Sequence, residues 1–97
     1  CRAPLEMIRC CCRALLLLEE MLEKGSRLLL TDVGCGALLC KSAMECAALS
    51  VFVNTAGLTD RESAAEMEQQ VEDALGTYLP LADRIAASVT AYIRKEE

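Results

Sequence analysis

The chain has 97 residues, of which 54% are hydrophobic and only 3% aromatic, and its net charge is −5. The abundance of Ala, Leu, Met and Glu favours helices over strands, so we expect an all-α fold of one domain's worth or less. No cluster of Lys and Arg alternates with aromatic residues, which argues against a nucleic-acid-binding protein.

Charged residues also break up the most apolar segments. Lys41 and Glu45 interrupt the longest one, and no uninterrupted run approaches the roughly 20 residues of a membrane span. The first residues carry charge where a secretory signal needs an apolar core. We therefore expect a soluble, cytoplasmic protein without a membrane partner. The chain opens on Cys1 and not on Met, so we expect a trimmed or partial copy of something longer. Residues 1–97 are then a single helical domain or part of a larger one.

The first predicted element is an amphipathic helix from Pro4 to about Lys24, with Gly25 as its stop. Its apolar residues fall near one stripe. They are Leu5, Ile8, Cys12, Leu15 and Leu22. The opposite, solvent-facing side carries Glu6, Arg9, Arg13, Glu20 and Lys24.

After a short connector from Ser26 to Leu30, Thr31 or Asp32 is predicted to cap a central helix that ends at residues 54–57. Between Ala37 and Val53 this helix has hardly any polar side. Its clearly polar residues there are Lys41, Ser42, Glu45 and Ser50. A helix that is apolar nearly all round needs neighbours on most sides. The rest of the chain supplies too few, which predicts a homo-oligomer, a dimer or larger, with this helix or the final one at the interface.

Small residues mark the surface of the central helix. Gly34 and Gly36 lie in its first turns and lower its helix propensity, which indicates close approach of another backbone or of a ligand. Ala43, Ala47 and Ala48 continue the same surface. We favour tight contact between helices over contact with a ligand.

The final element is a long amphipathic helix from Asp60 to Lys95, opened by a capping box of Thr59 and Glu62. Unbroken, it would be about 54 Å long at 1.5 Å per residue, so we expect it to bend or to pack along another subunit. Pro80 predicts a kink there, because a helical proline crowds the carbonyl four residues earlier, here that of Gly76. Its apolar stripe comprises Ala64, Met67, Val71, Ala74, Tyr78, Leu81, Ile85 and Tyr92.

The seven cysteines do not form a recognisable metal or redox site. The chain has no CxxC and no histidine. Cys10, Cys11 and Cys12 are consecutive, so on a helix they point about 100° apart and do not converge on one ion. We expect small, buried, unreactive hydrophobes in a reducing compartment, and no metal.

Without histidine the chain has no imidazole base and no catalytic couple that depends on one. Any chemistry has to use carboxylates, amides, thiols or backbone dipoles. Asp32 is the leading candidate, although a capping Asp usually serves the helix alone.

From about Pro4 to its C-terminus the chain resembles the C-terminal part of the formiminotetrahydrofolate cyclodeaminase and methenyltetrahydrofolate cyclohydrolase family. The resemblance rests on order and spacing. The matching features are Pro4-Leu5 opening a helix, Gly25, Thr31-Asp32 in place of Ser-Asp, Val51 to Asn54 in place of Val-x-Ile-Asn, and Thr59-Asp60 before a long final helix. Ser26, Leu28 and Ser50 stand where the family commonly has Asn, and its Gly-rich turn has no counterpart.

The resemblance implies an all-helical, dimer-forming enzyme of folate-dependent one-carbon metabolism, with a tetrahydrofolate derivative as its substrate. The reaction would be ring closure of a formimino group with loss of ammonia, or addition of water to a methenyl bridge. Asp32 would stabilise the cationic intermediate, Asn54 would hold the pterin and Arg27 would meet the glutamate tail. The lost Asn positions keep a second reading open, a non-catalytic helical oligomerisation module derived from that enzyme.

Overall fold

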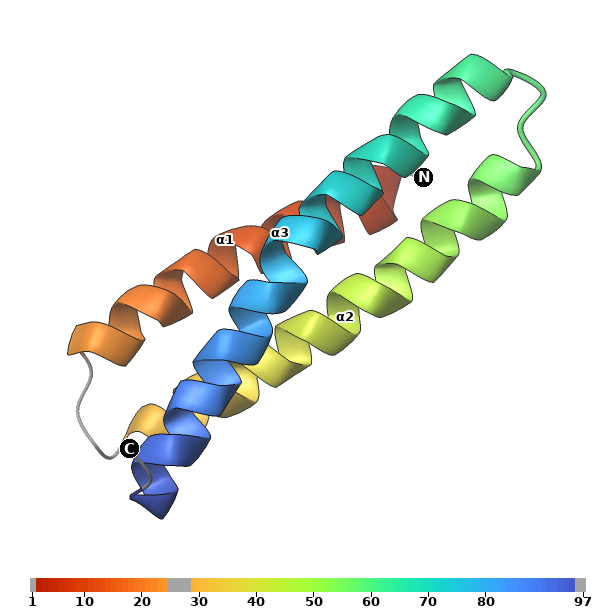
Figure 1. Cartoon of the computed structure of the whole chain (residues 1–97). Helices are drawn as coiled ribbons and strands as arrows, with labels where there is room; N and C mark the ends of the chain where they lie inside the picture. The colour runs from red at the N-terminus through yellow and green to blue at the C-terminus, as the bar shows by residue number, and fades with distance from the viewer. Residues whose placement is uncertain (1, 25–28, 96–97) are drawn as a thin grey trace.

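The computed structural model describes residues 2–24 and 29–95, and these form three helices (Figure 1). They are α1 (Arg2–Lys24), α2 (Leu30–Ala56) and α3 (Arg61–Arg94). The expected all-α fold is confirmed. Cys1, Gly25 and Arg27 lie outside the described residues, so the predicted stop of the first helix and one predicted ligand contact have no structural counterpart here.

Helices α2 and α3 form an antiparallel hairpin closed by residues 57–60 (Figure 1). Gly57 ends α2, as the sequence predicts. The cap of α3 is Asp60 and not Thr59: its carboxylate accepts a hydrogen bond from the Ser63 amide at 3.1 Å. Arg61 closes the turn by donating to the Thr55 and Leu58 carbonyls at 2.8 and 3.0 Å. An arginine on the last carbonyls of a helix suits the negative end of its dipole.

Helix α1 packs against both members of this hairpin, so the core lies where the three helices meet. Ile8 and Leu15 are its buried residues from α1, and Val71, Leu81 and Ile85 come from α3. The remaining residues of both predicted stripes pack against this core, except Tyr92, which is half exposed. The bundle is elongated, measuring 53 × 20 × 15 Å.

The two glycines at the start of α2 face other helices. A Cβ at Gly34 would lie 3.0 Å from Val89 Cγ1 on α3, and a Cβ at Gly36 would lie 3.2 Å from Leu18 Cδ1 on α1. Both positions therefore let a neighbouring side chain approach closely, which supports helix packing as the reason for these residues.

The start of α2 differs from the prediction. Its N-cap is Leu29, with no side-chain hydrogen bond, and Thr31 and Asp32 lie inside the first turn. The predicted Thr31 or Asp32 cap is therefore wrong. Asp32 still places a negative charge in the first turn, where the helix dipole favours it.

Helix α2 is buried on one side only. Its core-facing residues include Val33, Ala37, Met44 and Val51. Large apolar side chains on the other side reach solvent, namely Leu38, Leu39, Leu49 and Val53, at 50, 70, 67 and 75% exposure. We call these four residues with Cys35 and Cys46 the outer face of α2. They recur at helical spacing, so the expectation that this chain alone cannot cover α2 holds for the described residues.

Length and hydropathy alone would allow α2 to cross a membrane, since its most apolar window has a mean hydropathy of 1.5. This criterion tolerates up to two charged residues, so the predicted absence of a membrane span stays a prediction. The core helix of a soluble protein meets the same criterion, but such a helix is mostly buried, whereas only 28% of this window is buried.

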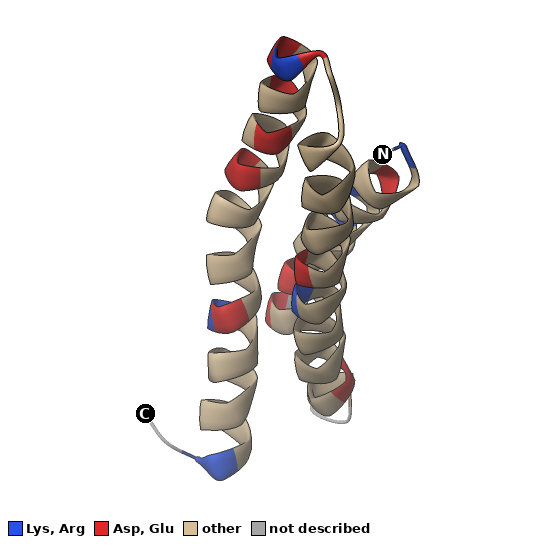
Figure 2. Cartoon of the chain, turned by 90° about the vertical axis from the view of Figure 1, so that its right-hand side faces the viewer, with Lys and Arg blue, Asp and Glu red and all other residues tan. Residues whose placement is uncertain are grey.

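Helix α3 runs without a break through Pro80. The predicted kink remains a prediction. Most of its acidic residues lie in the first half of the helix, and Asp83 lies in the second half (Figure 2). The helix ends at Lys95, which adopts a left-handed conformation with φ 58° and donates its amide to Tyr92 at 3.2 Å.

Candidate functional site

Asp32 is exposed in the first turn of α2. The amides of a first helical turn have no partner inside the helix, and together with the dipole they make this end locally positive. An exposed carboxylate there can meet a cationic group of a ligand. Within residues 2–24 and 29–95, no hydrogen bond or ion pair involves the Asp32 side chain.

Asn54 is exposed near the other end of the same helix. Its side-chain Nδ2 donates to the Ser50 carbonyl at 2.9 Å, and the Ser50 hydroxyl in turn donates to the Cys46 carbonyl at 3.5 Å. Both polar side chains thus fold back onto their own helix in this structure. The acceptor oxygen of the Asn54 amide is the group that a ligand could use.

The structure does not bring Asp32 and Asn54 together within one chain. They are 22 residues apart on one continuous helix, which is about 33 Å at 1.5 Å per residue. They do share a side of α2, because 22 residues return the helix to within about 40° of its starting direction. Both therefore border the outer face of α2. Arg27, the third predicted site residue, lies outside the described residues.

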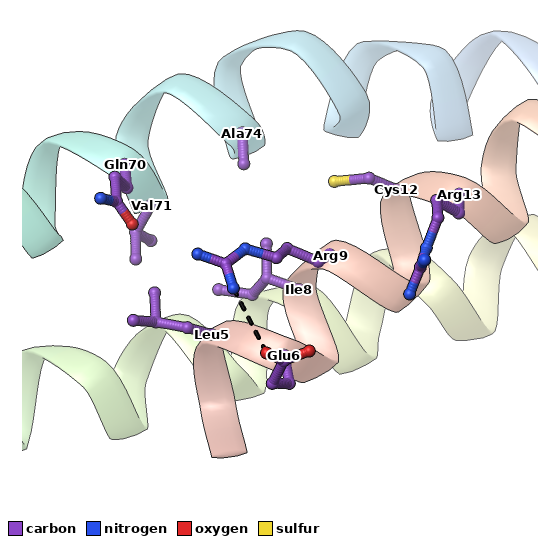
Figure 3. A pocket seen from close by; sticks show the side chains of 9 residues that line it. All are labelled: Leu5, Glu6, Ile8, Arg9, Cys12, Arg13, Gln70, Val71 and Ala74. Atoms are coloured by element: carbon purple, nitrogen blue, oxygen red, sulfur yellow. Dashed lines mark hydrogen bonds and ion pairs between the residues drawn. The ribbon is translucent and has the colours of Figure 1, made fainter. Parts of the chain in front are cut away.

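A groove that was not predicted from the sequence lies between α1 and α3 (Figure 3). Its volume is about 400 Å³. Its polar lining consists of Glu6, Arg9, Arg13 and Gln70. Arg9 Nη1 lies 3.3 Å from Glu6 Oε1, and Arg13 Nη2 donates to Cys10 Sγ at 3.5 Å. Figure 3 shows the Arg9 guanidinium extended over the space between the two helices.

The sequence held one signal for this groove. Arg9 and Arg13 are four residues apart, so they lie on one side of α1. Both are exposed, which confirms the predicted solvent-facing side for these two residues. The sequence did not predict that α3 places the apolar Val71 and the small Ala74 next to these two arginines.

The cysteines differ from the prediction of buried hydrophobes. Cys10, Cys35 and Cys46 are exposed, and Cys11, Cys12 and Cys40 are partly buried. Burial, reinforced by the neighbouring Cys40 thiol, raises the pKa of Cys11 to about 11. Burial also raises the pKa of Cys12. Within residues 2–24 and 29–95, no three Cys, Asp or Glu side chains are grouped so that they could hold a metal ion.

One polar pair lies where α2 meets α3, with Thr55 buried and Glu68 partly buried. The Thr55 hydroxyl, which is fully buried, donates to the Glu68 carboxylate. A buried hydroxyl without a partner would be costly, so this bond satisfies a group that the hairpin has to bury. It therefore serves the fold beside Asn54 and not an open site.

Comparison with known proteins identifies relatives of the chain. The family model described as formiminotransferase-cyclodeaminase matches residues 1–73. A methenyltetrahydrofolate cyclohydrolase from Methylorubrum extorquens is 33% identical over 90 residues, covering 93% of this chain and 43% of that protein. The chain thus spans less than half the length of this relative. No solved structure gives a significant match.

Proposed function

The chain belongs to the formiminotransferase-cyclodeaminase family, and from this premise we propose that it serves folate-dependent one-carbon metabolism in the cytoplasm. Its reaction is cyclodeamination of formiminotetrahydrofolate or hydrolysis of methenyltetrahydrofolate. The observation that carries the proposal is the 33% identity to the cyclohydrolase, which extends over 93% of the chain and so includes all three helices.

In this proposal the chain contributes Asp32 as the catalytic group. Both reactions pass through amidinium or iminium character, and a carboxylate held at a fixed place stabilises such a cation as it forms. Asn54 offers an amide to the pterin and Arg27 a guanidinium to the glutamate tail. The 33 Å that separate Asp32 from Asn54 along α2 are too long for one folate molecule to touch both in one chain.

The outer face of α2 suggests how the two residues can meet. An antiparallel pair of α2 helices, related by a two-fold axis near Met44, would set Leu39 against Leu49 of the partner subunit. The same axis sets Cys35 against the partner's Val53. Large apolar side chains thus meet across the axis at Leu39 and the partner's Leu49, as is typical of the core of an interface. The exposed Glu45 borders this face.

In the same arrangement Asp32 of one subunit lies opposite the last turn of its partner's α2. Measured along the helix axis, Asp32 then lies two residues, or about 3 Å, from the partner's Asn54. A homodimer of this kind would build two composite sites, each with a carboxylate from one subunit and an amide from the other. The homo-oligomer is therefore part of the proposed function.

The direct test uses the complete protein, since the chain spans less than half of its relative. Purified protein is mixed with formiminotetrahydrofolate and assayed for ammonia, and separately with methenyltetrahydrofolate and assayed for ring opening. We expect one of the two reactions to be faster than the uncatalysed rate by several orders of magnitude. A complete protein that accelerates neither would favour the non-catalytic oligomerisation module.

A further inference from the structure

The groove between α1 and α3 combines an apolar floor with a positive rim. The floor is formed by Leu5, Ile8, Val71 and Ala74. Ile8 and Val71 are buried beneath it, at 3 and 1% exposure, so the floor is part of the packed core and not a loose gap. Small-molecule sites commonly pair such a surface with a few polar groups that orient the ligand.

The charge of the rim is unusual for this chain. Two arginines, Arg9 and Arg13, stand against one carboxylate, that of Glu6, whereas the chain as a whole has a net charge of −5. A second groove between the same helices gives the comparison. It holds about 200 Å³ and sets Glu19 and Glu23 against Arg84. Only the first groove therefore favours an anion.

The groups on the rim suit a carboxylate. A guanidinium binds a carboxylate through two parallel hydrogen bonds. Arg9 Nη1 forms an ion pair with Glu6 Oε1 at 3.3 Å, and both side chains are exposed. Exposed ion pairs are weak and exchange partners readily. A ligand carboxylate can therefore replace Glu6 as the partner of Arg9, while the Gln70 amide offers a donor from the opposite helix.

We propose that this groove binds a ligand that joins a flat apolar ring to a carboxylate, and that the ligand is the benzoylglutamate end of a folate. The inference rests on the proposed function for the identity of the ligand. The ring lies on the floor above Val71 and Ala74, and the glutamyl carboxylates pair with Arg9 and Arg13. No residue of α2 lines the groove, so this site is distinct from Asp32 and Asn54 and holds a folate without placing its pterin at Asp32.

The test measures binding of p-aminobenzoyl-L-glutamate to the 97-residue chain by calorimetry, with amide NMR shifts to locate the ligand. We expect shifts at Cys12, Val71 and Ala74, and affinity that falls as salt is added. Arg9→Ala and Arg13→Ala should each weaken binding by roughly fivefold or more. Arg84→Ala is the matched control, because Arg84 lines the second groove, and it should leave the affinity unchanged.

Two further variants separate recognition from folding. Glu6→Gln removes the carboxylate that competes with the ligand for Arg9, so it should tighten binding. A variant that only damaged the fold would weaken binding instead. Ala74→Leu fills the floor while keeping both arginines, and should abolish binding with the helical circular dichroism retained. The corresponding Glu19→Gln variant in the second groove should have no effect.

The outcomes are distinct. No binding of p-aminobenzoyl-L-glutamate, or binding that Arg9→Ala and Glu6→Gln leave unaltered, overturns the groove as a site. If the complete protein still turns over a folate, the proposed function survives that failure. Conversely, binding in the groove by a protein without either folate reaction supports the site and removes the proposed enzyme function.

Discussion

Lys41 Nζ lies 2.8 Å from Asp83 Oδ1 and joins the middle of α2 to α3 across 42 residues of sequence. Lys41 is the only cation of α2, and its partner Asp83 belongs to the other helix of the hairpin. The hydrogen bond to Asp83 raises the pKa of Lys41 above its ordinary value. Because the two side chains are 33 and 57% exposed, the pair aligns the helices more than it stabilises them.

Asp83→Asn should lower the pKa of Lys41 toward its ordinary value, which can be measured by NMR titration of the lysine side chain. A group whose pKa rises on folding stabilises the fold below its unfolded pKa and loses that contribution as pH rises through the folded pKa. The small stability difference between wild type and Asp83→Asn should therefore persist at neutral pH, begin to fall near pH 10.5 and vanish only above the raised pKa of Lys41. Asp73→Asn, whose carboxylate accepts from Gln69, should leave Lys41 unchanged.

The two glycines of α2 should respond oppositely to alanine. Gly34→Ala places a Cβ 3.0 Å from Cγ1 and 3.2 Å from Cβ of Val89, a buried, β-branched residue with little freedom to move. Crowding of this kind costs about 1–3 kcal/mol, which exceeds the gain of about 1 kcal/mol in helix propensity. Urea denaturation should show a less stable protein.

Gly36→Ala is the matched comparison. Its Cβ meets the terminal methyl carbons of Leu18 at 3.2 and 3.3 Å, and Leu18 is only partly buried. The end of a flexible side chain can turn aside, so the propensity gain of up to about 1 kcal/mol should dominate. Equal effects of the two substitutions would show that helix propensity, and not contact with α1 and α3, decides at these positions.

The cysteines should label in an order set by exposure and pKa. Alkylation at pH 8, followed by mass spectrometry, should modify the exposed Cys10, Cys35 and Cys46 first. Cys11 should be slowest, because a pKa raised from 9.0 to about 11 leaves about a hundredfold less of the reactive thiolate. The difference should close as the pH approaches 11. Labelling of Cys11 as fast as Cys46 at pH 8 would contradict the burial of its thiol.

The ends and apolar stripes of the helices could be predicted from the sequence more fully than the contacts between helices. The end of α2 at Gly57 and the stripe through Val71 and Ile85 follow from local turn chemistry and helical period, which a sequence displays directly. The cap positions shifted by one to three residues, because adjacent residues compete for the same amides and packing selects among them. The Lys41–Asp83 pair and the groove above Val71 depend on how helices distant in sequence align, and no local pattern encodes that.

The outer face of α2 should mediate self-association. Leu39→Lys and Leu49→Lys each place a charge on this face and should convert an oligomer to a monomer, as measured by light scattering at micromolar concentration. Both residues are well exposed in one chain, so the fold should tolerate the change. Thr77→Lys, at an exposed position of α3, is the control and should leave the mass unchanged.

A wild-type monomer at micromolar concentration would count decisively against this interface. Co-flotation of the monomer with lipid vesicles, lost in Leu39→Lys, would assign the same face to a membrane, which the hydropathy of α2 allows. Neither result would alter the family to which the chain belongs.

Asp32→Asn tests the catalytic assignment in the complete protein. Asp32 is exposed and makes no cap, so removing its charge costs only its interaction with the helix dipole, about 0.5 kcal/mol at a surface position. Turnover should fall about tenfold or more, since each 1.4 kcal/mol of lost transition-state stabilisation is one decade in rate. Glu72→Gln removes an exposed carboxylate from α3, away from the outer face of α2, and should leave turnover intact. If Asp32→Asn retains the full rate, the catalytic group lies elsewhere, because a carboxylate that stabilises a developing cation cannot be neutralised without slowing the reaction.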